Sequence, residues 1–247
     1  MKKIILMFIL LLCYTSVYSQ NHVKIIKGSE SVFSHTSDVD SITFHSFTCG
    51  DKVLYGGEVY PTVLIGSQCW FARNLNIGTR INGSQNAADN GIIEKYCNGD
   101  NENNCNTYGG LYQWNEAMQY VTTSGAKGIC PTGWHIPTIA EITTLSNTAG
   151  GVSTGGNALK AIGQGVYQSP SQNGVGTNTS GFSALLGGYR QPYVAYYGNI
   201  GANAYFLSSS QINSTFTNYM NLQFNYSNIT LSLIEKDYGF SVRCVKD

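Results

Sequence analysis

Hydrophobic and polar residues alternate along two stretches near the C-terminus. Between residues 219 and 226 every second side chain is apolar or aromatic, namely Met220, Leu222, Phe224 and Tyr226. The closing stretch "GFSVRCVKD" repeats this period with Phe240, Val242 and Cys244. A period of two residues is typical of half-buried antiparallel strands. The pattern therefore predicts two strands and turns Cys244 toward the interior.

Further strands are predicted toward the N-terminus. Residues 53–72, "VLYGGEVYPTVLIGSQCWFA", contain β-branched and aromatic runs separated by glycines, which is the pattern of a meander. Residues 23–33 predict strand, turn and strand around Gly28 and Ser29. We expect residues 20–48 to form a small β-hairpin appendage.

Two segments have helical periodicity. Within residues 110–121, "GLYQWNEAMQYV", the apolar residues fall on one helical face: Leu111, Trp114, Met118 and Val121. A second helix should begin at Thr138, because Thr138 and Glu141 have the spacing of a capping box. Its buried stripe is Ile139, Ile142 and Leu145.

The remaining segments look irregular. Residues 73–106 are rich in Asn and Gly, and we expect them to be too polar to contribute to the core. Past Gly150 the pattern predicts loops apart from a short helix around residues 158–162.

The first 19 residues are typical of a secretory signal peptide. Lys2 and Lys3 precede an apolar run over residues 4–13, and small Ser19 stands at the cleavage position. This run is shorter than the roughly 20 residues that a membrane-spanning helix needs. We therefore expect an exported protein, secreted or at the cell surface and not membrane-spanning, whose main domain covers residues 49–247.

Six cysteines remain outside the signal peptide: Cys49, Cys69, Cys97, Cys105, Cys130 and Cys244. An even number in an exported chain indicates disulfides, and six cysteines permit 15 pairings. Cys97 and Cys105 enclose the short, turn-prone span "NGDNENN", so we expect them to pair with each other. A loop this small stabilises the fold by roughly 2 to 3 kcal/mol.

Charge excludes one class of partner. Only 11% of residues are charged and the formal net charge is zero, whereas about 25% is usual. Binding to nucleic acid through a basic face is therefore not expected.

Several motifs together resemble the Fibrobacter succinogenes major paralogous domain family. They are, in order, "YPTVLIGSQCWFARNLN", "YCNGDNENNCNTYGGLYQWNEAM", "GICPTGWHIPTIAEITTL", "GFSALLGGYR", "YFLSSS" and "YGFSVRCVKD". The family is similar to C-type-lectin-like proteins, a fold shared with formylglycine-generating enzymes. The resemblance implies an α+β domain with two helices packed on twisted antiparallel sheets and with its termini brought together. It also implies the pairs Cys97–Cys105 and Cys130–Cys244, which leaves Cys49–Cys69.

The chain departs from the family pattern at three positions. Ile142, Phe206 and Leu207 stand where the family often has tryptophan. Because these residues remain apolar, we interpret the changes as repacking of a core rather than as the loss of a ligand contact.

Catalysis is not expected. Formylglycine-generating enzymes use two reactive cysteines that hold copper, and a reactive thiolate must be free. Six bonded cysteines would not permit that reaction. The stretch "GVSTG", residues 151–155, matches a serine-hydrolase elbow, but it follows a predicted helix and no histidine follows it.

Two candidate binding features remain. Asp100 and Glu102 lie among amide side chains, and their oxygens predict a candidate site for a hard cation such as calcium. The site is not an EF-hand, because the glycine that the EF-hand turn requires is missing. Tyr189, Tyr193, Tyr196 and Tyr197 cluster in "YRQPYVAYYGN", and exposed tyrosines recognise glycans or proteins.

The favoured function is a non-enzymatic binding or adhesion module for polysaccharide or a cell-surface protein. The alternatives are an oxidase related to formylglycine generation and a structural component of a surface assembly.

Overall fold

The computed structural model describes residues 26–27, 30–31, 46–192, 194 and 196–247. The chain divides into two compact units, Met1–Phe47 and Thr48–Asp247. In the first unit, β1 (Ile26–Lys27) pairs antiparallel with β2 (Glu30–Ser31), as the sequence pattern predicts. The expected signal peptide, residues 1–19, lies outside the described residues.

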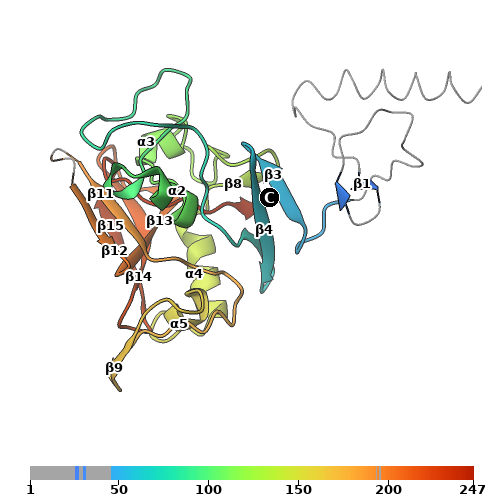
Figure 1. Cartoon of the computed structure of the whole chain (residues 1–247), viewed down its shortest axis with the longest axis vertical. Coiled ribbons are helices and arrows are strands. Elements are labelled where there is room, and N and C mark those ends of the chain that lie inside the picture. The colour runs from blue at the N-terminus through green and yellow to red at the C-terminus, as the bar shows by residue number, and fades with distance from the viewer. Residues whose placement is uncertain (1–25, 28–29, 32–45, 193, 195) are drawn as a thin grey trace, which may run out of the picture. The chain divides into compact units, whose positions relative to one another are not determined.

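The second unit is a mixed α and β structure built around two five-stranded sheets (Figure 1). Sheet 1 has the order β3-β4-β5-β16-β8. Its strands are β3 (Lys52–Tyr55), β4 (Glu58–Ile65), β5 (Gln68–Phe71), β8 (Trp134–His135) and β16 (Val245–Lys246). The three strands of the predicted meander are therefore confirmed. The terminal strand β16 lies between β5 and β8, so the two ends of this unit meet in one sheet.

Sheet 2 has the order β12-β11-β13-β14-β15. Its strands are β11 (Gly187–Gln191), β12 (Tyr196–Ile200), β13 (Asn203–Gln211), β14 (Phe216–Gln223) and β15 (Ile229–Glu235). All neighbours are antiparallel except β11 and β13, which run parallel and share the single pair Gly188 and Ala204.

Short elements connect the sheets. Two small ladders join β6 (Thr79–Arg80) to β7 (Glu94–Lys95) and β9 (Tyr167–Ser169) to β10 (Gln172–Asn173). The helices are η3 (Asn98–Asp100), α2 (Glu102–Tyr108), α3 (Trp114–Ala117), α4 (Ile139–Thr148) and α5 (Gly156–Leu159). The last of these lies slightly before the predicted position.

The predicted capping box begins α4. The Thr138 hydroxyl accepts from the Glu141 N–H, and the Glu141 carboxylate accepts from the Thr138 N–H. Ile142 and Leu145 are buried, and α4 packs on β13 and β14 (Figure 1).

The helix predicted over residues 110–121 is wrong for most of its length. Only Trp114–Ala117 is helical, because the backbone of Tyr112 pairs with Phe240 and the backbone of Leu111 pairs with Tyr96. Gln119 and Tyr120 then adopt left-handed backbone angles, which end the helix. Periodicity therefore identified three buried side chains, those of Leu111, Trp114 and Met118, but not their backbone conformation, and it was wrong for Val121, which is 46% exposed.

The prediction that residues 73–106 are too polar for the core is also wrong. Leu75 and Ile77 are buried in a core cluster, and Tyr96 is fully buried as well. The segment also contributes most of α2, which ends at Tyr108 and is capped by Gly109. Gly109 has a φ of 85°, and a Cβ there would lie 2.6 Å from that of Asn74, so only glycine fits. A few apolar side chains anchor this otherwise polar segment.

The unit contains two hydrophobic cores that share β5. Phe71 packs with Tyr60 and Trp134 in one core, whereas the neighbouring Trp70 packs with Phe182 in the other. Ile142, Phe206 and Leu207 are all buried, which confirms that the departures from the family pattern lie in the core. Consecutive residues on a strand face opposite sides, so β5 serves both cores.

Residues 239–244 pass between the two sheets in an extended conformation. Gly239 exchanges hydrogen bonds with Arg190 of β11, and Ser241 bonds to Tyr205 and Leu207 of β13. Cys244 is fully buried, as predicted, and forms a disulfide with Cys130.

The other disulfides are Cys49–Cys69 and Cys97–Cys105. These three pairs are those that the family resemblance implies. All six cysteines outside the expected signal peptide are therefore bonded, which indicates an extracytoplasmic location. Among the described residues, no helix is long and apolar enough to cross a membrane.

Candidate functional site

Five tyrosines come together on sheet 2 and the segment that follows it, and we call them the tyrosine surface: Tyr189, Tyr196, Tyr205, Tyr219 and Tyr238. Tyr196 is 52% exposed and the others are half-buried. Neighbouring rings have centroids 5.4 to 6.4 Å apart. The arrangement is a continuous aromatic surface that solvent reaches.

The buried ring of Phe240 supports this surface. It stacks on Tyr205 with centroids 4.8 Å apart and contacts Tyr219 at 5.2 Å and Tyr238 at 6.1 Å. Phe240 reaches this position because residues 239–241 pair with both β11 and β13. The terminal segment therefore holds the tyrosines as well as closing the fold.

Strand register places Tyr205 and Tyr219 on the same face of sheet 2. Leu207, two residues beyond Tyr205, is paired with Tyr219. Paired residues share a face, and so do residues two apart on one strand. Phe206 and Met220 point to the opposite face, where they enter the second core.

Three phenol groups of the surface, those of Tyr189, Tyr205 and Tyr219, are neutral hydrogen-bonding groups at ordinary pH. Burial raises the pKa of Tyr189, Tyr205 and Tyr219 above the usual value of 10. The Tyr205 oxygen accepts from Asn199 at 2.8 Å, and Tyr219 is hydrogen-bonded to Ser232. These hydroxyls can still donate to an acceptor on a ligand.

The four tyrosines predicted from sequence separate in the structure. Tyr189 and Tyr196 belong to the tyrosine surface. Tyr197 does not, because its hydroxyl donates to Asp100 at 2.8 Å and its ring lies against Gly83, where a Cβ would be 2.7 Å away. Tyr193 lies outside the described residues.

Sequence reasoning missed Tyr205, Tyr219 and Tyr238 as members of the surface. The alternation in residues 219–226 places Tyr219 on the face opposite Met220. It does not show which strand lies beside it. Only the register between β13 and β14 brings Tyr205 next to Tyr219.

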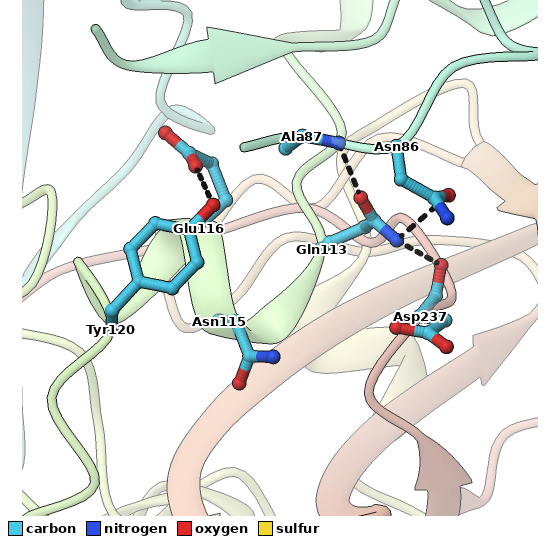
Figure 2. A pocket seen from close by; sticks show the side chains of 7 residues that line it. All are labelled: Asn86, Ala87, Gln113, Asn115, Glu116, Tyr120 and Asp237. Atoms are coloured by element: carbon cyan, nitrogen blue, oxygen red, sulfur yellow. Dashed lines mark hydrogen bonds between the residues drawn. The ribbon is translucent and has the colours of Figure 1, made fainter. Parts of the chain in front are cut away.

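A polar hollow of about 190 Å³ lies at the start of α3 (Figure 2). Its lining residues are Asn86, Ala87, Gln113, Asn115, Glu116, Tyr120 and Asp237. Figure 2 shows Glu116 and Tyr120 on one side and Gln113, Asn86 and Asp237 on the other. None of the five residues of the tyrosine surface lines it.

Arg190 holds one wall of the hollow in place. Its buried guanidinium donates to the carbonyls of Gly83, Gln85 and Asp237 and to Oδ1 of Asn86. It also lies over the ring of Tyr96, 4.5 Å from the ring centroid. This single side chain thus fixes the loop that contains Asn86.

Gln113 fixes the same wall from the other direction. Its Oε1 accepts from the Ala87 N–H and the Tyr96 hydroxyl, and its Nε2 donates to Asn86 and to the Asp237 carbonyl. Both ends of the amide are therefore used in building the wall.

Glu116 is the most deeply buried acidic group of the hollow, with 1% of its surface exposed. It accepts hydrogen bonds from the Glu94 N–H at 3.0 Å and the Tyr120 hydroxyl at 2.8 Å. Burial raises the pKa of Glu116 above its usual value, and these two hydrogen bonds oppose the shift. Both donors are uncharged.

Asp100 and Glu102, the predicted cation ligands, are each engaged by groups of the protein. Asp100 accepts from the Gly83 N–H and from Tyr197. Glu102 forms ion pairs with Arg80 at 3.3 Å and Lys95 at 3.6 Å. Positive side chains beside Glu102 disfavour a metal ion there. Cys97 and Cys105 lie close to Glu102, but their sulfurs are joined in a disulfide.

The fold and this chemistry define a disulfide-bonded, extracytoplasmic α+β domain. A comparison with known families matches residues 63–246 to the Fibrobacter succinogenes major domain. The chain belongs to this family, as the motifs indicate. Comparisons with curated proteins and with solved structures found no match.

Proposed function

We propose that this protein is a non-enzymatic binding module of C-type-lectin-like fold that recognises polysaccharide through the tyrosine surface. The observation that carries the proposal is the array of five partly exposed tyrosines held by Phe240. Tyrosine rings offer large apolar faces at low conformational-entropy cost, and each carries a polar hydroxyl. This combination suits sugar rings, which have apolar faces and hydroxyl rims.

The electrostatics support an uncharged ligand. The chain has a formal net charge of zero, and burial keeps the phenols of Tyr189, Tyr205 and Tyr219 neutral by raising their pKa. Recognition would then rest on stacking and on hydrogen bonds to hydroxyls, which depend weakly on salt.

The fold and location in the proposal rest on separate observations. Pairing of β16 with β5 brings the ends of the domain together, as the C-type-lectin-like resemblance requires. The N-terminal pattern of residues 1–19 and the three disulfides support export to the cell surface or beyond. Six bonded cysteines support a non-enzymatic role over an oxidase, since its thiolates must be free.

A glycan array probed with the folded, unreduced protein tests this function, first with calcium and then with a chelator. We expect binding to a neutral polysaccharide that survives chelation. Tyr196→Ala should weaken it at least ten-fold, and Tyr205→Phe should weaken it less because the ring remains. Tyr167→Ala is the matched control, since Tyr167 is 61% exposed on β9 and lies outside the tyrosine surface.

Three results would contradict the proposal. They are no binding to any glycan on the array, binding that is lost when calcium is chelated, and equal affinities for Tyr196→Ala and the unmodified protein. Absence of glycan binding, together with oligomers that form as protein concentration rises, would favour the alternative function, a structural component of a surface assembly.

A further inference from the structure

The polar hollow beside α3 has chemistry that the tyrosine surface does not share. Its volume of about 190 Å³ is smaller than the ~300–1,000 Å³ of sites for drug-sized ligands. It can therefore hold one small chemical unit. Ala87 and the ring of Tyr120 contribute apolar surface to the lining, and the other five lining residues are polar or acidic.

Glu116 places a buried carboxylate in the wall of this hollow. Every hydrogen-bond donor recorded for it is neutral: the Glu94 N–H, the Tyr120 hydroxyl and the Gln119 amide. Within the described part of the chain no ion pair involves Glu116. A buried carboxylate that accepts only from neutral donors is therefore free to pair with a positive group of a ligand.

Other acidic side chains lie near the same wall of the hollow. The negative charges of Glu116, Asp89 and Glu94 each raise the pKa of the Tyr120 phenol, in addition to the effect of burial. Arg190 on the opposite wall donates to the carbonyls of Gly83, Gln85 and Asp237 and to the amide oxygen of Asn86, and in the described part of the chain it forms no ion pair with Glu116.

Two amides at the rim are open for hydrogen bonding. The exposed side chain of Asn115 has no hydrogen-bond partner among the described residues, and the same holds for Nδ2 of Asn86. Together they offer donors and an acceptor to hydroxyl groups at the mouth of the hollow (Figure 2).

We propose that the hollow is a second binding site, which takes a sugar residue carrying a protonated primary amine. The ammonium group pairs with the wall of Glu116 and Tyr120, and the sugar hydroxyls bond to Asn115 and Asn86. An amino sugar suits this lining better than a lysine side chain, because Asn115 and Asn86 offer hydrogen bonds that sugar hydroxyls can use and the apolar stem of lysine cannot.

NMR titration of the folded, disulfide-bonded protein with glucosamine tests the site. We expect glucosamine to shift the amide resonances of residues 113–120 and to bind at least ten-fold more tightly than glucose or N-acetylglucosamine, which lack the charge. Glu116→Gln keeps the size of the side chain and should abolish this preference.

Asn115→Ala provides a second variant at an exposed position, where loss of folding is not expected. It should weaken glucosamine binding by several-fold. Glu102→Gln removes a more exposed carboxylate outside the hollow and should leave glucosamine binding unchanged.

Equal affinity for glucosamine and glucose would overturn the proposal, and so would an unchanged preference in Glu116→Gln. Nα-acetyl-lysine binding as tightly as glucosamine would overturn the assignment to an amino sugar. Calcium binding that needs Glu116, with no response to glucosamine, would make the hollow a cation site instead. Neutral polysaccharide binding through Tyr196 can succeed or fail independently of all these outcomes.

Discussion

Nε2 of His135 lies 2.8 Å from Oε1 of Glu141, the residue that closes the capping box of α4. Nδ1 of the same ring lies 2.7 Å from a carboxylate oxygen of Asp247. A neutral imidazole has one N–H, so only the protonated ring can donate to both carboxylates. The hydrogen bond with Glu141 raises the pKa of His135, although burial opposes it. Burial by itself would raise the pKa of Glu141, but the hydrogen bonds from His135 and Thr138 lower it below its usual value.

The contact between His135 and Glu141 should make the stability of the fold depend on pH. The raised pKa of His135 stabilises the fold below its unfolded value of about 6.5, and the effect is lost as pH rises through the folded value. The lowered pKa of Glu141 stabilises the fold above the unfolded value of about 4.5, and this stabilisation is lost as pH falls through the folded value. We expect His135→Gln to cost about 1 kcal/mol near pH 5.5 and clearly less near pH 8, measured by urea unfolding. Equal losses at both pH values would contradict this account.

The disulfide Cys130–Cys244 should stabilise the fold more than Cys97–Cys105. The first closes a separation of 114 residues and the second a separation of 8. Chain entropy predicts losses of about 5 and about 2.5 kcal/mol when each pair is replaced by alanine. Urea unfolding of the two double variants measures the difference, and the reverse order would refute the explanation.

Replacing Arg190 with lysine should destabilise the fold by about 2 to 4 kcal/mol. Lysine cannot reproduce the planar fork that bonds to Gly83, Gln85 and Asp237, and it leaves buried carbonyls without donors. Hydrogen exchange should speed up in residues 82–87. Arg73→Lys is the control, because Arg73 forms a partly exposed ion pair with Glu58 and should cost less than about 1 kcal/mol.

Phe240→Leu should loosen the tyrosine surface without removing a tyrosine. The leucine keeps the core filled but loses the ring that stacks on Tyr205, so we expect a loss of about 1 to 2 kcal/mol. The near-UV circular dichroism of the tyrosines should weaken as well. Phe216→Leu, at a site 38% exposed, should change stability by less than about 0.5 kcal/mol. An unchanged near-UV spectrum in Phe240→Leu would show that Phe240 does not order the tyrosines.

Predictions from sequence were most accurate where interactions are local. The capping box at Thr138 and the strand meander over residues 53–72 depend on neighbours within a few positions, and both are confirmed. The same holds for the bond between Cys97 and Cys105. The helix over residues 110–121 was overpredicted because pairing with the distant Phe240 competes with helix formation at Tyr112.

The sequence by itself determined the compartment indicated by paired cysteines, the family, and the inward direction of Cys244. Only the tertiary structure decided that residues 239–241 insert between β11 and β13, and that Tyr205, Tyr219 and Tyr238 therefore surround one buried phenylalanine. It also decided that Tyr197 turns toward Asp100 and that Glu116 is buried but forms no ion pair with the residues that the structure describes. The physical reason is that alternation specifies which face a side chain takes, whereas register between strands far apart in the chain specifies which side chains meet.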